Sequence, residues 1–348
     1  MFNSFKNNQN ISEDNYKKLS HELENLKNKN EELEKTLNKV YELENNIKEL
    51  NEEKHNIITK YDKILDSYYN QFTTIFLYCD LKTKGPLRNF QIFNQELLNF
   101  VVNVCKKHKL DYWIDFGTLL GAVRHGGYVP WDDDIDIGMM RKDYNKFISV
   151  FQSEIVTHGL EEDIVFQVNE RRTNAGWKIS FLQIMFLSHR KHMLAGMDIF
   201  PYDYINNPPE NLEEKYNQEQ RNFVQKMKDD MNIMQYLDEY YQEFNISMEK
   251  SNHIIPGIDN NSRGEIHGYP FVLMSSDLIF PLEKISFNNN EYCCPRNNDE
   301  YLKLIYGDYS SIPQIIATHD RAKLLQKEYD DDYYEKYINK LKTINEHF

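Results

Sequence analysis

The densest group of chemically active side chains in the sequence is an acidic run, WDDDIDI, at residues 131–137. Its four carboxylates are those of Asp132, Asp133, Asp134 and Asp136. Carboxylates this close raise one another's pKa unless a cation compensates their charge. In a strand, residues two apart point to the same face. Asp134 and Asp136 should therefore project together, and the isoleucines beside them should face the core.

Two carboxylates on one face of a rigid strand form a natural site for Mg²⁺ (or Mn²⁺). Such an ion takes few protein oxygens and shares the rest of its coordination with water and phosphate. The alternative is an acidic turn that is merely solvated, and the apolar residues around this short strand favour the metal site. We therefore predict Asp134 and Asp136 as catalytic, metal-binding residues.

A second signal lies upstream, where Gly117 and Thr118 separate an expected strand from an expected helix. Glycine lets backbone amides approach a ligand closely, and a helix N-terminus binds anions. Thr118 could cap that helix or bond a phosphate. Arg124, about one and a half helical turns further on, offers a planar fork to phosphate. His125 is ambiguous, because it either contacts phosphate or caps the helix end.

The elements that must position these residues alternate between strands and helices. Helices are expected at residues 92–109, 119–125, 142–151 and 299–306 and over the charged segment 210–249, and strands at 111–116, 135–139, 164–168, 177–183 and 196–199. Asn297 or Asn298 can cap the helix at 299–306, and Gly307 can end it. The pattern is typical of an α/β or α+β domain, and we predict the α+β class, with a mixed sheet and flanking helices.

Residues 11–70 contain no glycine or proline and carry a heptad pattern. One apolar seam runs through Leu19, Leu26, Leu33, Val40 and Ile47, and a shifted seam follows at Leu43, Leu50, Ile57 and Ile64. Leu23 and Leu37 fill the complementary heptad position, which Asn30 and Asn51 also occupy. Heptads with charged flanks predict an N-terminal α-helical coiled coil that joins copies of the chain, in parallel or antiparallel orientation. The alternative is a long solvated helix folded back on the same chain.

We place a domain boundary near Gly85-Pro86, with a stalk at residues 1–80 and a second domain at 81–348. The chain of 348 residues has a formal net charge of −14, which disfavours non-specific nucleic-acid binding. Its cysteines have no zinc-site spacing and are expected to be reduced. No apolar run approaches the roughly 20 residues of a membrane span, and the N-terminus has no signal-peptide core. We therefore expect a cytoplasmic protein, with any membrane contact peripheral.

The run GTLLGAVRHGGYVPWDDDIDI, at residues 117–137, closely resembles the signature of the LicD/fukutin-like phosphotransferase family, within the nucleotidyltransferase superfamily. The likeness extends from about residue 85 to about residue 320, and takes in MRKDYNKF, MDIFPYD and FPLEKISFNNNEYCCPRNNDEYLKLIYGDYSSIP. The N-terminal heptads lie outside it. The resemblance implies a nucleotidyltransferase-like fold for the second domain.

The resemblance also implies roles for particular residues. Gly117 and Thr118 match the turn that holds the donor phosphates in this superfamily. Asp134 and Asp136 match its metal-binding pair of aspartates. Arg124 matches a basic position of the family and is a candidate for phosphate binding.

A third metal-binding carboxylate of the superfamily comes from a later, neighbouring strand. Asp198 in MDIFPYD is the candidate for this catalytic role, and Asp203 is the fallback. Lys178, in an expected strand, is a further candidate for the donor phosphates, with a surface lysine as the alternative.

The activity that the resemblance implies is transfer of a phosphoryl-linked group, such as phosphocholine or phosphoribitol, from a CDP-activated donor to a glycan or polysaccharide hydroxyl. One or two metal ions would assist it. Two alternatives stay open. One is another nucleotidyltransferase acting on a small molecule or RNA, and the other is a non-catalytic coiled-coil scaffold.

Overall fold

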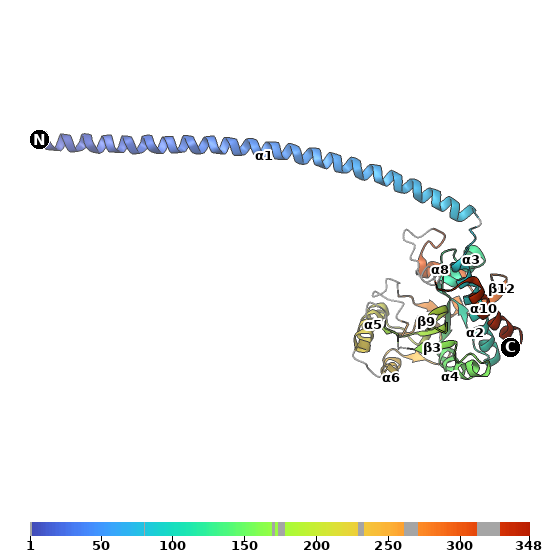
Figure 1. Ribbon diagram of the computed structural model, residues 1–348. Coiled ribbons are helices and arrows are strands. Elements are labelled where there is room, and N and C mark those ends of the chain that lie inside the picture. Colours follow the sequence, from blue (N-terminus) through green and yellow to red (C-terminus); the bar gives the residue numbers. More distant parts are fainter. Residues whose placement is uncertain are drawn as a thin grey trace. The chain divides into compact units, whose positions relative to one another are not determined.

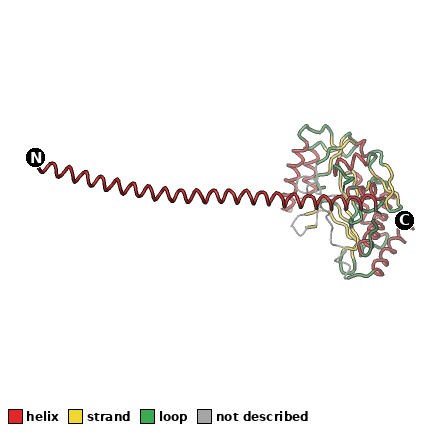
Figure 2. The backbone as a smooth tube through the Cα atoms, turned by 90° about the horizontal axis from the view of Figure 1, so that it is seen from above, coloured by secondary structure: helices red, strands yellow, loops and turns green. Residues whose placement is uncertain are grey.

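The computed structural model describes residues 2–79, 81–168, 171–172, 178–228, 233–260, 271–311 and 328–348. The chain divides into two compact units, Met1–Cys79 and Asp80–Phe348. The first unit is a single unbroken helix, α1 (Phe2–Tyr78), drawn as one red coil in Figure 2. The apolar residues of both heptad seams are exposed along α1 in the single chain. The long helix is as predicted, and its pairing into a coiled coil stays a prediction.

The second unit is built on a mixed sheet in the order β1-β2-β7-β6-β3. These strands are β1 (Trp113–Ile114), β2 (Asp136–Met140), β7 (Met193–Ile205), β6 (Leu182–Leu187) and β3 (Ile164–Val168). Strands β2 and β7 are parallel, and the other pairs along this order are antiparallel. The end of β7 also pairs with β8 (Ile246–Ser247) and β9 (His253–Pro256), and β9 pairs with β10 (Met274–Ser275).

Helices cover both sides of this sheet. They are α2 (Pro86–His108), α3 (Phe116–His125), α4 (Arg141–Thr157), α5 (Leu212–Lys228), α6 (Ile233–Glu243), α7 (Ser276–Ile279), α8 (Asn298–Tyr306) and α10 (Asp331–Glu346). Figure 1 shows α2 and α10 together on one side of the strands and α5 and α6 on the other. Two further pairs of short antiparallel strands are separate from this sheet, β4 (Arg171–Arg172) with β5 (Lys178–Ile179) and β11 (Glu283–Phe287) with β12 (Asn290–Cys294). The predicted α+β class is therefore confirmed.

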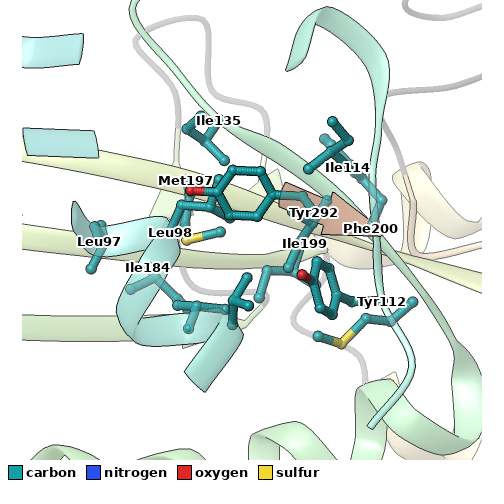
Figure 3. Close-up of a cluster of buried hydrophobic side chains, with 14 of the residues drawn as sticks. Leu97, Leu98, Tyr112, Ile114, Ile135, Ile184, Met197, Ile199, Phe200 and Tyr292 are labelled. Atoms are coloured by element: carbon teal, nitrogen blue, oxygen red, sulfur yellow. The ribbon is translucent and has the colours of Figure 1, made fainter. Parts of the chain in front are cut away.

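The main core lies between the sheet and α2. Strand residues at alternate positions face α2, where Leu97 and Leu98 are fully buried. Figure 3 shows both leucines in one cluster with Ile184 of β6, with Met197 and Ile199 of β7, and with Ile135, the residue before β2. Because side chains alternate across a strand, the residues between these positions face the opposite side of the sheet.

Several predicted boundaries were wrong. The strand expected at 111–116 is only two residues long, because Phe116 already begins α3. The strand expected at 177–183 is two strands in the described part, β5 and β6, and Trp177 lies outside the described residues. The strand expected at 196–199 is part of a longer strand, β7, which has 13 residues. The segment 210–249 is not one helix, since α6 ends at Glu243 and β8 follows.

Helix α8 begins and ends where its capping signals predict. Asn297 is the N-cap of α8, and its side chain accepts a hydrogen bond from the backbone N–H of Glu300 at 3.3 Å. Gly307, with a φ of 67°, follows the last residue of the helix. None of the described helices is long and apolar enough to cross a membrane.

Candidate active site

A row of three polar side chains crosses the sheet on the face opposite the main core. The parallel register of β2 and β7 places Asp136 directly beside Asp198, and the antiparallel register of β6 places Gln183 on the other side of Asp198. Neighbouring strands are about 4.8 Å apart, so these side chains share one face at close range. Gln183 Nε2 donates a hydrogen bond to Asp198 Oδ1 at 2.8 Å. Nothing local in the sequence marks Gln183 as a site residue, because only strand pairing brings it to Asp198.

The acidic loop before β2 brings further carboxylates to this row. One side-chain oxygen from each of Asp132, Asp133 and Asp134 lies within 4.8 Å of the others. A methyl group built on Gly117 would lie 2.7 Å from Asp132 Oδ2 and 3.6 Å from Asp136 Oδ2. The first turn of α3 is therefore in direct contact with the acidic cluster. Asp132 was not among the predicted site residues, although it lies in the same acidic run.

Burial and neighbouring carboxylates both raise pKa values within this acidic cluster. Burial raises the pKa of Asp136 well above its ordinary value, and the charges of Asp134, Asp198 and Asp132 raise it further. Burial also raises the pKa of Asp132 well above its ordinary value, with Asp134 as the main charged contributor. Closely spaced carboxylate oxygens are the ligands that Mg²⁺ and Mn²⁺ prefer. The donor set therefore fits a divalent cation, which would offset the repulsion.

The turn that leads into α3 is fixed by a buried carboxylate. Asp115 is fully buried and is the N-cap of α3, where its Oδ1 accepts a hydrogen bond from the backbone N–H of Phe116 at 2.8 Å. The hydroxyls of Tyr202 and Tyr301 donate to the same carboxylate at 2.6 and 2.7 Å. Phe116 has a φ of 40°, a left-handed conformation that is rare for a bulky residue. Such strain persists only where surrounding contacts hold it, and here it directs Gly117 toward the acidic cluster.

Thr118 has a different position from the one expected. It lies within the first turn of α3, and the helix cap is Asp115 instead. The buried Thr118 Oγ1 accepts a hydrogen bond from the backbone N–H of Asp136 at 2.8 Å. The hydroxyl therefore joins α3 to the start of β2, which fixes the spacing between the helix N-terminus and the carboxylates.

Two basic residues, Arg124 and Lys178, were predicted to bind the donor phosphates. Arg124 lies seven residues after Gly117, which is about two helical turns and roughly 10 Å along the same side of α3. Its Nη1 donates a hydrogen bond to the carbonyl oxygen of Tyr309 at 3.1 Å, and burial lowers the pKa of Arg124 and of the neighbouring His125. Lys178 begins β5, and its side chain lies outside the described part of the structure.

Two buried amides on α2 hold the acidic loop from the core side. Gln91 Nε2 donates to the carbonyl oxygen of Asp132 at 2.9 Å, and Asn94 Nδ2 donates to that of Asp133 at 2.7 Å. Asn94 Oδ1 also accepts from the backbone N–H of Gly196 on β7 at 2.8 Å. A signal for these residues was present in the sequence, as two amides on the buried side of an apolar helix require partners.

Asp203, the fallback for the third carboxylate, belongs to a separate buried ion-pair network. It lies five residues after Asp198 on β7, an odd separation that puts the two side chains on opposite faces of the strand. Asp203 Oδ1 lies 2.7 Å from Arg141 Nε, and both residues are buried. The structure therefore places the fallback carboxylate in an ion pair with Arg141, on the strand face opposite Asp198.

Carboxylates on adjacent parallel strands, facing the N-terminus of a helix, have the chemistry of a site for a divalent cation and a phosphate. Residues 109–238 match a family model described as the LicD/FKTN/FKRP nucleotidyltransferase domain. This segment is therefore similar to that domain, and the resemblance to the LicD/fukutin-like family seen in the sequence is confirmed.

Two curated relatives show the same resemblance over parts of their length. The chain is 38% identical over 131 residues to the lipopolysaccharide cholinephosphotransferase LicD of Haemophilus influenzae, a match that covers 36% of this chain and 48% of the relative. It is 43% identical over 49 residues to the human ribitol 5-phosphate transferase FKRP, covering 14% of this chain and 10% of the relative. The match thus spans about half of the Haemophilus protein and a small part of the human one.

Replacing Gly117 with alanine should weaken metal binding without unfolding the domain. The φ of Gly117 lies outside the left-handed region, so alanine is tolerated by the backbone, but its methyl group would displace the Asp132 carboxylate. Disturbing groups that orient metal ligands typically costs about 10- to 100-fold in affinity. Calorimetric titration with Mg²⁺ would measure the loss, and thermal unfolding would check the fold. An unchanged affinity in a stable variant would show that Asp132 lies outside the ion site.

Proposed function

We propose that the chain is a metal-dependent phosphotransferase of the nucleotidyltransferase fold. It would move a phosphoryl-linked group, phosphocholine-like or phosphoribitol-like, from a CDP-activated donor to a hydroxyl of a glycan or polysaccharide. The observation that carries the proposal is the register that sets Asp136 beside Asp198, next to the N-terminus of α3. The relatives named as cholinephosphotransferase and ribitol 5-phosphate transferase support the class of transferred group.

In this proposal the acidic cluster holds Mg²⁺ or Mn²⁺. Asp134, Asp136 and Asp198 are the assigned ligands, and the position of Asp132 adds it as a fourth candidate. A bound cation would offset the negative charge that develops on phosphate oxygens during transfer. Gln183 would orient the Asp198 carboxylate through its hydrogen bond, since an oriented ligand is part of most metal sites.

The remaining residues would position the substrates. Backbone N–H groups at Gly117 and Thr118 would hold the donor phosphates, as free amides at a helix N-terminus bind anions. Arg124, about two turns along the same side of α3, would reach a second phosphate oxygen. Asp198 would accept the proton of the acceptor hydroxyl, because its strand neighbours place it at the centre of the row. Lys178 remains a candidate for the donor phosphates.

The deciding experiment measures CMP release from CDP-choline and CDP-ribitol with Mg²⁺, with and without a glycan acceptor mixture. We expect Mg²⁺-dependent turnover of one donor and a loss of at least about a hundredfold in Asp134→Ala and Asp136→Ala. Asp238→Ala is a matched control, because it removes an exposed carboxylate from α6.

Two other outcomes would favour the alternatives. Release of pyrophosphate from nucleoside triphosphates, without CMP release from either donor, would favour a different nucleotidyltransferase. The absence of turnover together with no calorimetric binding of Mg²⁺ or donor would favour a non-catalytic scaffold.

A further inference from the structure

Helix α1 carries an apolar seam without a partner in the single chain. From Leu19 to Val40 the seam residues follow one another at alternating separations of four and three residues, the heptad spacing. The seam contains Leu19, Leu23, Leu26, Asn30, Leu33, Leu37 and Val40. Its apolar members are each between 44% and 70% exposed. A seam this regular on a single helix is the contact surface of a coiled coil.

The position of one polar residue decides the orientation of the partner. With Leu19, Leu26 and Leu33 at heptad position d, Asn30 occupies position a. In a parallel, in-register pair the two Asn30 side chains face each other and can exchange hydrogen bonds. In an antiparallel pair, residues at a face residues at d, and every d residue from Leu19 to Val40 is apolar. An antiparallel partner would therefore bury the Asn30 amide against a hydrocarbon side chain.

The charges that flank the seam agree with this orientation. In a parallel pair, position g of one helix lies beside position e of the next heptad on its partner. These positions hold Glu22 with Lys27, and Lys29 with Glu34. Both pairs are of opposite charge, and each forms twice by symmetry. Residues five apart do not face each other on one helix, so the complementarity acts only between helices.

We propose that α1 pairs with α1 of a second copy of this chain, as a parallel, in-register, two-stranded coiled coil. Asn30 sets the register, as a single polar residue at position a does in parallel dimers. The seam shifts by three residues after Val40 and continues through Leu43, Ile47 and Leu50, so the pairing extends beyond the first segment. Two copies of the Asp80–Phe348 unit would then be carried at the same end of one stalk.

Disulfide trapping in the full chain tests the orientation. Leu19→Cys and Leu33→Cys are made separately in a Cys79→Ser background, which removes an exposed native thiol. A parallel, in-register pair sets each new cysteine against its own copy, so both variants should give covalent dimers under a glutathione redox buffer. An antiparallel pair can bring at most one of the two positions opposite itself. Lys35→Cys, on the outer side of the helix, is the matched control and should not crosslink.

Charge reversal tests the partner contacts independently. Lys27→Glu should weaken association about threefold to tenfold, because two attractive contacts per dimer become repulsive. The double variant Glu22→Lys with Lys27→Glu should restore it, and Lys35→Glu should leave it unchanged. Light scattering would follow the dimer, at twice the chain mass of 41.8 kDa. A monomeric wild type, crosslinking at only one position, or no recovery in the double variant would overturn the proposal.

Discussion

Replacing Asp136 with asparagine should abolish phosphotransfer and, at the same time, stabilise the metal-free protein. The change keeps the shape of the side chain but removes one charge from a cluster in which Asp134, Asp198 and Asp132 all raise the pKa of Asp136. Activity should fall by at least about a hundredfold, because a ligand of the proposed metal ion is lost. The free energy of unfolding without metal should rise by about 1 kcal/mol, within the usual range for stabilising substitutions.

The pH dependence of this stabilisation has a definite sign. Asp136 has a folded-state pKa above its unfolded value, so the folded protein holds the proton more tightly. Its contribution to stability is fully present below the unfolded pKa and is lost as pH rises through the folded pKa. The advantage of Asp136→Asn over the wild type should therefore be small near pH 4 and largest above neutral pH, in metal-free buffer.

Urea unfolding followed by tryptophan fluorescence would measure both effects. Trp113, Trp131 and Trp177 all belong to the Asp80–Phe348 unit, so the signal reports that unit and not α1. Added Mg²⁺ should reverse the order of stability, because a ligand at a hundredfold excess over its Kd stabilises the binding-competent wild type by about 2.7 kcal/mol. Asp238→Asn serves as the control. If the metal-free Asp136→Asn protein is less stable than the wild type, the inferred repulsion between Asp136 and its neighbouring carboxylates is contradicted.

Replacing Arg141 with methionine should be the most destabilising change outside the apolar core. Arg141 is 2% exposed and donates from Nε and Nη2 to Asp203 at 2.7 and 3.1 Å. Its Nη1 and Nη2 also donate to Asp259 at 2.8 and 2.5 Å. Methionine would leave two buried carboxylates without a cation. Removing one partner from such a network typically costs about 3–5 kcal/mol.

The neighbouring residue provides a matched control. Lys142 forms an ion pair with Glu249 at 3.0 Å, but its side chain is 66% exposed. Lys142→Met should therefore change stability by less than about 1 kcal/mol. Burial raises the pKa of Asp203. The cost of Arg141→Met should therefore shrink at low pH, because protonation of Asp203 removes one of the charges left without Arg141. Equal effects of the two substitutions, or a cost that grows at low pH, would contradict the role of the buried network.

The acidic motif and the elements around it were largely predictable from sequence, because their signals are local. The alternation of apolar and acidic residues at 135–137 predicted which side chains face the core, and Ile135 and Ile137 are fully buried. Capping residues marked both ends of α8. The ends of helices and strands were less predictable where they depend on side chains that are distant in the sequence. The start of α3 at Phe116 depends on Tyr202 and Tyr301, which hold Asp115 from distant parts of the chain.

The sequence by itself determined that a long N-terminal helix precedes an α+β unit, and that its acidic motif opens a strand. Periodicity and capping act over a few residues, so they can be read without the fold. Only the tertiary structure separated the surroundings of Asp198 from those of Asp203, which share one strand and differ in the face they occupy. The pairing of β2 with β7 sets Asp198 beside Asp136, 62 residues earlier in the chain, and the same strand turns Asp203 toward Arg141. Such contacts depend on strand order and register, which no local pattern specifies.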